Sequence, residues 1–326
     1  MHLKAHKMNT PGTTRILLRS AALCCGLVLM QASIAATRPL PDVTIDDTNV
    51  YPESMSSASD GTLYIGSMRG NVFRARPGSD KAEAWIRRTP ENGILSLLGV
   101  LVDERSSTLW LCSAPGTLLI PPVTGVSALL ALDLKTGASK GIYPFPDPPG
   151  VCNDITVAKD GTAYASDTPN GRIFRLRRGA RSLELFSADP RLKGIDGLVV
   201  GGDGTLYVNI VTHNQLLRID RKPDGSAGDI VELSLSQPVA GPDGFRLIAK
   251  NRFLLAEGNG GRIDEVTIEG DKATVRVLKE GLISPPGVAL VGHTAYALEG
   301  KIRYLFDPKL KGQDPGPFKA YAVPLN

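Results

Sequence analysis

The segment Lys159-Asp160-Gly161-Thr162-Ala163-Tyr164 is the clearest indication of the fold, because close copies of it recur along the chain. Two further copies are Ser59-Asp60-Gly61-Thr62-Leu63-Tyr64 and Gly202-Asp203-Gly204-Thr205-Leu206-Tyr207. In each copy an apolar or small-residue run precedes Asp-Gly, and a β-prone run follows it. Asp-Gly supplies the positive φ angles that tight turns between antiparallel strands require, so each copy predicts a β-hairpin.

The hairpin is one unit of a repeat that continues along the chain. An aromatic or apolar residue marks each repeat at intervals of roughly 42 to 54 residues: Tyr64, Trp110, Tyr164, Tyr207, Leu254 and Tyr296. Third strands are expected at 71–75, 172–176, 215–219, 262–266 and 301–306, and weaker fourth strands at 183–186, 230–233 and 273–278. The pattern predicts an all-β fold, a six-bladed β-propeller of four-stranded antiparallel blades around a central channel. No segment between the strands has the sustained 3.6-residue period of a crossover helix, which argues against a parallel α/β fold.

The last repeat lacks a fourth strand of its own. Either 42–45, near the start of the propeller, or 319–323, near the end of the chain, is suited to supply it and so to close the ring. We favour the amino-terminal segment.

The first thirty-six residues have the pattern of a secretory signal peptide. Four basic residues precede an apolar run at 21–30, which is too short to span a bilayer, and small residues follow it. We therefore expect a signal peptide at 1–36, a propeller domain at 37–326, and export to the periplasm or the exterior without stable membrane association.

The charge balance argues against nucleic acid as a partner. The chain has 37 basic and 33 acidic residues, and the signal segment holds four basic and no acidic ones, so 37 − 4 = 33 basic residues balance 33 acidic ones. One local basic run remains: Arg172, Arg175, Arg177, Arg178 and Arg181. We interpret it as the solvated face of an outer strand rather than a polyanion site. The expected partner is a small-molecule substrate.

Two cysteines remain after the signal segment. Cys112 and Cys152 either form a disulfide, as export to an oxidising compartment would favour, or stay as two separate buried thiols. Zinc fits poorly, because His213 and His293 are the only histidines beyond the signal and lie far apart in sequence.

One register position carries the functional signal. Eleven residues before their markers, four repeats have a side-chain oxygen, at Glu53, Asn153, Asp196 and Asp243. The other two repeats have Gly99 and Pro285 there.

In a ring of blades equivalent positions face a common axis, so these oxygens should converge and bind a cation. Calcium is the expected ion, because it takes six to eight oxygens in flexible geometry. Mg²⁺ and Mn²⁺ are the other candidates by ligand type, and Zn²⁺ is the least suited divalent cation.

The residues around these positions resemble the gluconolactonase and senescence-marker-protein (regucalcin) family and, more distantly, the paraoxonases. The resemblance rests on Tyr51-Pro52-Glu53, Cys152-Asn153-Asp154, Gly194-Ile195-Asp196-Gly197 and Gly241-Pro242-Asp243-Gly244. It implies a six-bladed propeller that hydrolyses lactones or related esters with a divalent cation. By position, Glu53, Asp196 and Asp243 would be metal ligands, and Asn153 would bind the metal or the substrate.

The chain departs from the family pattern in two places. The family commonly has Asn where this chain has Asp196, which adds a negative charge to the site. No arginine clearly matches the one with which sugar-lactone enzymes of this group contact their substrate, which weakens the expectation of a sugar lactone.

For the chemistry we expect metal-assisted hydrolysis, with Asp243 or Asp196 taking the proton from the attacking water. His213 is an alternative base or substrate contact, against its interpretation as an exposed loop residue. The apolar segment 118–123 either roofs a hydrophobic substrate or packs against a neighbouring loop. Two other functions stay open, a non-catalytic binding propeller and a strictosidine-synthase-like enzyme without a metal.

Overall fold

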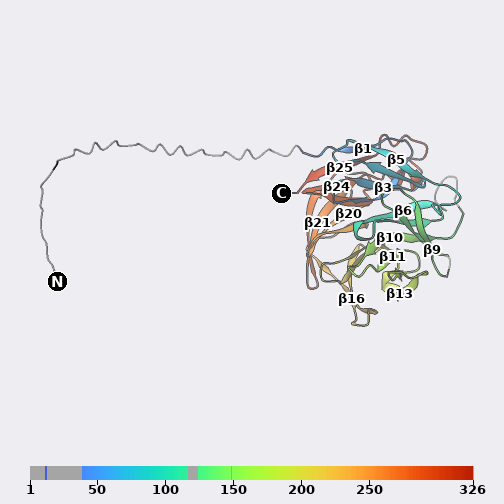
Figure 1. Ribbon diagram of the computed structural model, residues 1–326, viewed down its shortest axis with the longest axis vertical. Coiled ribbons are helices and arrows are strands. Elements are labelled where there is room, and N and C mark those ends of the chain that lie inside the picture. The colour runs from blue at the N-terminus through green and yellow to red at the C-terminus, as the bar shows by residue number, and fades with distance from the viewer. Residues whose placement is uncertain (1–11, 13–38, 117–123, 148, 326) are drawn as a thin grey trace, which may run out of the picture. The chain divides into compact units, whose positions relative to one another are not determined.

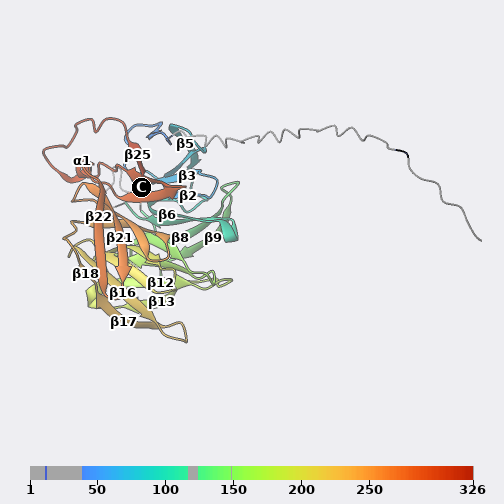
Figure 2. The same ribbon diagram turned by 90° about the vertical axis from the view of Figure 1, so that its left-hand side faces the viewer.

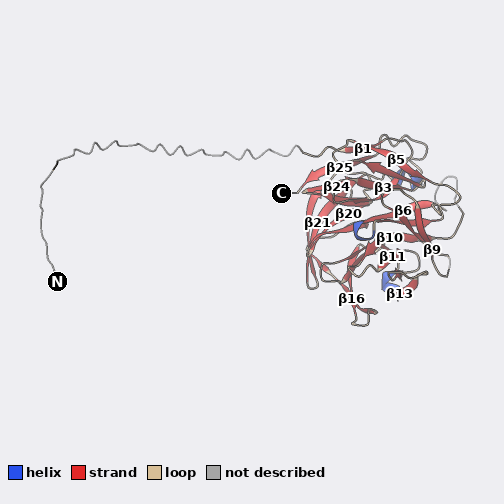
Figure 3. Ribbon diagram, in the orientation of Figure 1, coloured by secondary structure: helices blue, strands red, loops and turns tan. Residues whose placement is uncertain are grey.

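The structure, a computed structural model, describes residue 12 and residues 39–116, 124–147 and 149–325. Pro39–Asn326 is one compact unit, and its described residues form a six-bladed β-propeller of antiparallel blades (Figures 1 and 3), which confirms the predicted fold class. The segment 1–36, apart from residue 12, lies outside the described residues. Within the described part, no helix has the length and apolar character needed to cross a membrane.

Blades 1 to 3 each have four strands, ordered from the channel outward. Blade 1 has β2 (Pro52–Ser57), β3 (Leu63–Ser67), β4 (Asn71–Ala75) and β5 (Lys81–Arg87). Blade 2 has β6 (Ser96–Asp103), β7 (Thr108–Ala114), β8 (Ala128–Asp133) and β9 (Ser139–Pro144), with the short helix η1 (Glu104–Ser106) in its first turn. Blade 3 has β10 (Cys152–Val157), β11 (Ala163–Asp167), β12 (Arg172–Leu176) and β13 (Glu184–Ala188).

Blades 4 to 6 repeat this order. Blade 4 follows η2 (Pro190–Leu192) and has β14 (Ile195–Val200), β15 (Leu206–Ile210), β16 (Gln215–Arg221) and β17 (Ala227–Glu232). Blade 5 has β19 (Pro242–Ala249), β20 (Arg252–Glu257), β21 (Arg262–Glu269) and β22 (Lys272–Lys279), with β18 (Ser234–Leu235) at its edge (Figure 2). Blade 6 has β23 (Gly287–Val291), β24 (Thr294–Leu298), β25 (Lys319–Pro324) and β1 (Val43–Ile45).

Blade 6 uses both terminal segments, and this closes the ring. β25 is its third strand, and β1 is its fourth strand, as the preference for the amino-terminal segment predicted. β1 pairs antiparallel with β25 and also parallel with β5, with Ile45 opposite Ala82. Blades 6 and 1 therefore share one eight-stranded sheet.

The predicted third strand at 301–306 is wrong. The chain there forms a turn and the short helix α1 (Arg303–Phe306), because Lys301 has a left-handed backbone with φ 52°. The Lys301 ammonium donates hydrogen bonds to the carbonyls of Pro315 and Pro317. These bonds connect the start of the loop between β24 and β25 to its end. Ile302 and Leu305, three residues apart as on one helical face, pack against the blade 6–blade 1 core.

The hydrophobic core is divided among the blade interfaces. Within the described residues, each of six apolar clusters joins two neighbouring blades. Tyr207 of blade 4, for example, packs edge-on against Phe253 of blade 5, with ring centroids 5.3 Å apart. Because each blade buries its faces against its neighbours, the ring holds the inner strands in fixed positions around the channel.

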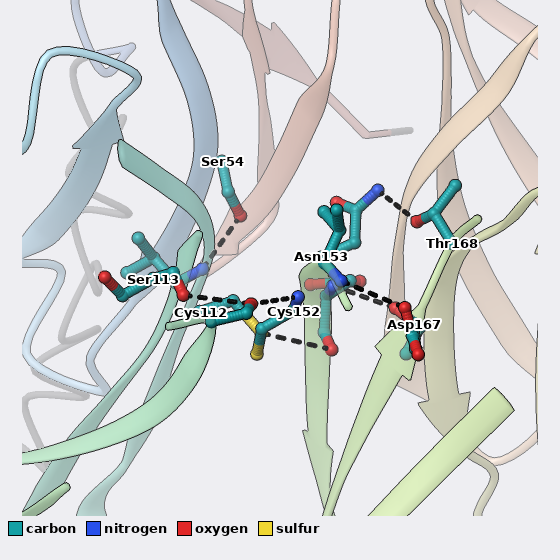
Figure 4. Close-up of a disulfide and its surroundings, with 12 residues drawn as sticks. Ser54, Cys112, Ser113, Cys152, Asn153, Asp167 and Thr168 are labelled. Atoms are coloured by element: carbon teal, nitrogen blue, oxygen red, sulfur yellow. Dashed lines mark hydrogen bonds between the residues drawn. A yellow bond between two sulfur atoms is a disulfide. The ribbon is translucent and has the colours of Figure 1, made fainter. Parts of the chain in front are cut away.

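A disulfide between Cys112 and Cys152 links blades 2 and 3 (Figure 4). Cys112 lies on β7 and Cys152 begins β10; both side chains are fully buried, and their Cα atoms are 5.0 Å apart. The bond lies directly before Asn153, one of the four register residues. Of the two states that the sequence left open, the structure contains the bridge.

We expect loss of this disulfide to lower the free energy of unfolding. A bridge that closes a 40-residue span removes enough entropy from the unfolded chain to stabilise the fold by about 4 kcal/mol. The double variant Cys112→Ala/Cys152→Ala should therefore lose about 2–5 kcal/mol in urea denaturation. The free energy of unfolding of the wild type is measured in its oxidised and reduced forms as well. This comparison separates the effect of the bond from that of the two sulfur atoms that the alanine substitutions remove. Equal stability of the two wild-type forms would contradict the prediction.

Candidate metal centre

Three carboxylates meet in the central channel. Glu53 lies on β2, Asp196 on β14 and Asp243 on β19, and one oxygen of each lies within 4.8 Å of the other two. Glu53 and Asp196 are buried, and Asp243 is half-buried. The structure thus brings together, from three blades, the three acidic residues that the repeat register selected.

A local irregularity of the inner strands directs these side chains. Glu53, Asp196 and Asp243 are each the second residue of their strand, at the point where the pairing with the next strand shifts register. We expected them just before the strands. A β-bulge adds a residue, bends the strand and changes the direction of a side chain, so the shift accounts for the common orientation.

The same irregularity also occurs in repeats without a carboxylate. β10 has the shift and carries Asn153 there. β6 also has it, but its hairpin is one residue longer: Trp110 pairs with Leu101, which places Leu98 rather than Gly99 in line with Asp196. Gly99 corresponds to Gly197, and a Cβ at either glycine would meet a carbonyl of the next blade, at 2.4 and 2.3 Å. β23, which Pro285 precedes, pairs with β24 without a shift. The position in blade 2 that matches the carboxylates therefore carries an apolar side chain, Leu98, which packs against the blade 6–blade 1 core and offers no ligand.

Asn153 lies beside the carboxylates as a hydrogen-bond donor. Its side-chain nitrogen donates to Thr168 Oγ1 at 2.8 Å (Figure 4), and its hydrogen bond to Asp196 lowers the pKa of that carboxyl group. In this arrangement the amide contributes N–H groups to the site, and this suits contact with a substrate oxygen.

The second strand of each of two blades fixes the backbone of the site. Ser166 Oγ accepts a hydrogen bond from the Asp154 amide at 2.9 Å and donates one to the Asp196 carbonyl at 2.8 Å. Asn209 Oδ1 accepts from the Gly197 amide at 3.0 Å, and its Nδ2 donates to the Asp243 carbonyl. These polar side chains join neighbouring blades at the residues that carry the carboxylates.

Sequence reasoning missed Ser166 and Asn209, although a signal was present. Each lies two residues after its repeat marker, Tyr164 or Tyr207. The side chain of each can both donate and accept hydrogen bonds. Cys112 stands at the same position after Trp110. The position two residues after the marker thus carries the side chains that fix the backbone of the position eleven residues before it.

Buried ion pairs fix the loops that enter two of the inner strands. Asp167 accepts a hydrogen bond from the Val151 amide at 3.0 Å and pairs with Arg172. In blade 5, Glu257 accepts from the Ala240 amide at 2.7 Å and pairs with Arg262 at 2.8 Å. Arg172 and Arg262 therefore have equivalent structural roles ahead of β10 and β19.

An ion pair crosses the channel near the carboxylates. Arg246 on β19 donates to both oxygens of Asp154 on β10, with Nη1–Oδ2 at 2.7 Å and Nη2–Oδ1 at 2.8 Å. The guanidinium also donates to Ser54 Oγ at 3.3 Å and to the Val100 carbonyl at 3.4 Å, so it contacts blades 1, 2 and 3 from blade 5. No pattern in the sequence singles out Arg246. Arg246 lies three residues after Asp243, but it forms its ion pair with Asp154.

Burial makes the ionised cluster costly. It raises the pKa of Asp196 to about 7, with the Asp154 charge adding to the shift. It also raises the pKa of Glu53 and Asp243 well above the usual range, and in each case a neighbouring carboxylate of the cluster adds to it. With Asp154 the site holds four carboxylates, and among the described residues Arg246 is the one cation that faces them. Full ionisation would leave three negative charges, which only protons or a cation can neutralise.

His213 is a surface residue. It is exposed on the loop between β15 and β16, with its Nδ1 2.9 Å from Thr212 Oγ1, beside Arg191 and Gln215. Within the described residues it makes no hydrogen bond or ion pair with Glu53, Asp196 or Asp243. The apolar segment 118–123 lies outside the described residues.

Comparison with known proteins identifies the fold. No protein-family model and no curated protein sequence matches this chain. Among solved structures, a gluconolactonase from Xanthomonas campestris is similar with 17% identity and a TM-score of 0.60, over 88% of this chain and 89% of that one. A luciferin-regenerating enzyme gives 14% identity and a TM-score of 0.61, over 87% of this chain and 92% of that one.

A third similar structure is a catalytically inactive virginiamycin B lyase from Staphylococcus aureus with quinupristin. It gives 13% identity and a TM-score of 0.58, over 87% of this chain and 98% of that one. Similarity at these identities concerns the fold, which proteins of different activity share. The chain has a gluconolactonase-like propeller fold.

Proposed function

We propose that this protein hydrolyses lactones or related esters with a divalent cation, calcium in the first place. The convergence of Glu53, Asp196 and Asp243 in the channel carries the proposal. The fold, shared with a gluconolactonase, supports the same reaction class. A substrate ester would bind at the carboxylate cluster.

The donor set suits a hard cation. Glu53, Asp196 and Asp243 would hold it through carboxylate oxygens, and no histidine or cysteine of the described residues stands in the cluster. Calcium, magnesium and manganese prefer such oxygens, whereas zinc sites usually include nitrogen or sulfur ligands. When bound, the cation would polarise the ester carbonyl and stabilise the negative charge that develops on its oxygen.

The protein's own groups would supply the proton transfer. Asp243 is the most accessible carboxylate of the three, since Glu53 and Asp196 are buried, so water reaches it most readily. We assign Asp243 as the general base, with Asp196 next to it. Asn153 would donate a hydrogen bond to the substrate and so orient it.

We also propose that the protein is exported. The signal-like segment 1–36 motivates this, and the Cys112–Cys152 disulfide supports it, since disulfides persist in oxidising compartments.

The first test is hydrolysis with and without metal. Purified protein should open aliphatic or aromatic lactones, and should incorporate one solvent ¹⁸O atom into the product carboxylate. Chelator should abolish the rate, and Ca²⁺, Mg²⁺, Mn²⁺ and Zn²⁺ added back separately should identify the ion that restores it. Ring opening without ¹⁸O would indicate an elimination. A rate that survives metal-free dialysis, or no activity on any ester, would reject the proposal.

Asp243→Asn should lower kcat/KM by about 10²- to 10⁴-fold, because the amide cannot accept the proton. The side chain keeps its size, so the fold should persist by circular dichroism. Asp229→Asn, on the exposed part of β17, is the matched control and should leave the rate unchanged. If Asp243→Asn retains full activity and metal content, Asp243 is not the base.

Calcium binding should strengthen as the pH rises. At neutral pH the metal-free carboxyl groups hold protons, since the pKa of Asp196 is about 7 and those of Glu53 and Asp243 are raised well above the ordinary range. The cation must displace these protons, so affinity should increase about tenfold per pH unit for each proton released. Titration calorimetry at pH 6, 7 and 8 measures this.

The thermal stability of the metal-free protein gives an independent check on these carboxyl groups. The folded state keeps protons that the unfolded chain releases above pH about 4, so stability should fall as the pH rises toward 7 and above. Calcium should reverse the loss. A pH-independent affinity would contradict the assignment of these three residues as ligands.

A further inference from the structure

A second candidate site lies between blades 2 and 3, away from the carboxylates. It is a groove of about 450 Å³ at the end of the blades where the Asp-Gly hairpins turn. The β6–β7 turn, the β10–β11 turn and the β12–β13 turn border it. Asn153 and the three carboxylates stand at the opposite ends of their strands, so the groove shares no residue with the candidate metal centre.

The wall of the groove is apolar and aromatic. Trp110 on β7 and Tyr143 on β9 lie with ring centroids 6.4 Å apart, and Leu176 of blade 3 faces the same space. The Trp110 indole nitrogen is buried and has no hydrogen-bond partner among the described residues. A volume of this size with an aromatic wall suits a small ligand with a flat apolar body.

The rim of the groove is basic. Five cationic residues line it: Arg105, Lys140, Lys159, Arg177 and Arg178. Among the described residues, Asp103 is the one acidic residue of the lining. Asp103 is already paired with Arg105 at 3.4 Å and accepts a hydrogen bond from the Ser106 hydroxyl. The groove therefore has an excess of positive charge.

Three of these cations have no carboxylate partner. The Lys140 ammonium donates to the Ser106 carbonyl and Thr108 hydroxyl, both at 2.8 Å, and the Lys159 ammonium donates to the Gly202 carbonyl at 3.0 Å. These hydrogen-bond partners are neutral. Lys140 also lies near Asp133, where its charge adds to the Thr136 hydrogen bonds that lower the pKa of that carboxyl group, so the charges left uncompensated are those of Lys159 and Arg178. Arg178 makes no hydrogen bond or ion pair within the described residues.

The nearby acidic side chains do not change this balance. Glu184 is paired with Arg175 and Arg177 at 2.6 Å, and Asp160 with Arg221 at 3.5 Å. The basic run that we interpreted from the sequence as a solvated face therefore divides. Its members at 172, 175 and 177 are ion-paired, while Arg178 faces the groove.

We propose that this groove binds a small organic anion, an aromatic or flat apolar body that carries a carboxylate, sulfate or phosphate. The body packs on Trp110 and Tyr143, and the anionic group lies at the rim near Lys140, Lys159 and Arg178. The proposal is independent of the hydrolase proposal, since it uses other residues at the opposite ends of the blades.

The test uses Trp110 as the reporter. The chain has two tryptophans, so Trp85→Phe leaves Trp110 as the only one. We expect 4-nitrobenzenesulfonate to quench its fluorescence saturably, with a Kd below about 1 mM. The neutral 4-nitrobenzyl alcohol and inorganic sulfate should bind at least about tenfold more weakly, because each lacks one half of the recognised chemistry. Calorimetry on the wild-type protein with the same probes repeats the measurement without the substitution.

A matched pair of variants tests the rim. Arg178→Ala removes a cation that has no structural partner, so the fold should be unaffected and binding should weaken about threefold or more. Arg181→Ala, an exposed residue of the same turn that does not line the groove, should leave the Kd unchanged. Chelator should have no effect. Equal binding of the neutral alcohol, equal Kd values in both variants, or no saturable binding below about 10 mM would each overturn the proposal.

Discussion

The bulge near the start of the inner strands is the constraint on which the site depends. A regular strand would alternate its side chains between the two faces of the blade, so Glu53, Asp196 and Asp243 would face neighbouring blades. The extra residue in β2, β14 and β19 turns them toward the axis instead. Because the blades are related by the ring, one local irregularity repeated in three of them is enough to build a cluster.

Such a cluster opposes folding unless the rest of the structure holds it. The three carboxylates are largely desolvated and repel one another, as their raised pKa values show. Arg246 supplies one positive charge, and Asp154 neutralises it. The backbone of the site is therefore fixed by other means: Ser166 and Asn209 join it to the next blade, and the disulfide lies directly before Asn153. These contacts stabilise a charge arrangement that is favourable only when a cation or protons are present.

Much of this arrangement was predictable, because repeats turn a local signal into a global one. The Asp-Gly hairpins indicated the blade unit and the six repeat markers indicated the blade count. The distance of eleven residues from marker to carboxylate then selected the cluster, although the bulge was not foreseen. The bulge itself was not predictable, so the register residues were placed just before their strands instead of inside them. The segment 301–306 misled us because apolar residues in a short run fit a strand or a helical turn, and the left-handed backbone of Lys301 decides between them.

Arg246 and Asp154 illustrate what a repeat cannot show. Their pairing joins blades 3 and 5 across the channel, so no register position relates the two residues, and neither repeats in the other blades. The groove between blades 2 and 3 has the same character, since its cations come from three turns and one outer strand that are distant in sequence. The repeat thus determines the positions that face the axis, whereas the contacts between particular blades determine where charge is left uncompensated. In this protein those contacts leave negative charge at one end of the blades and positive charge at the other, and so the two ends attract ligands of opposite sign.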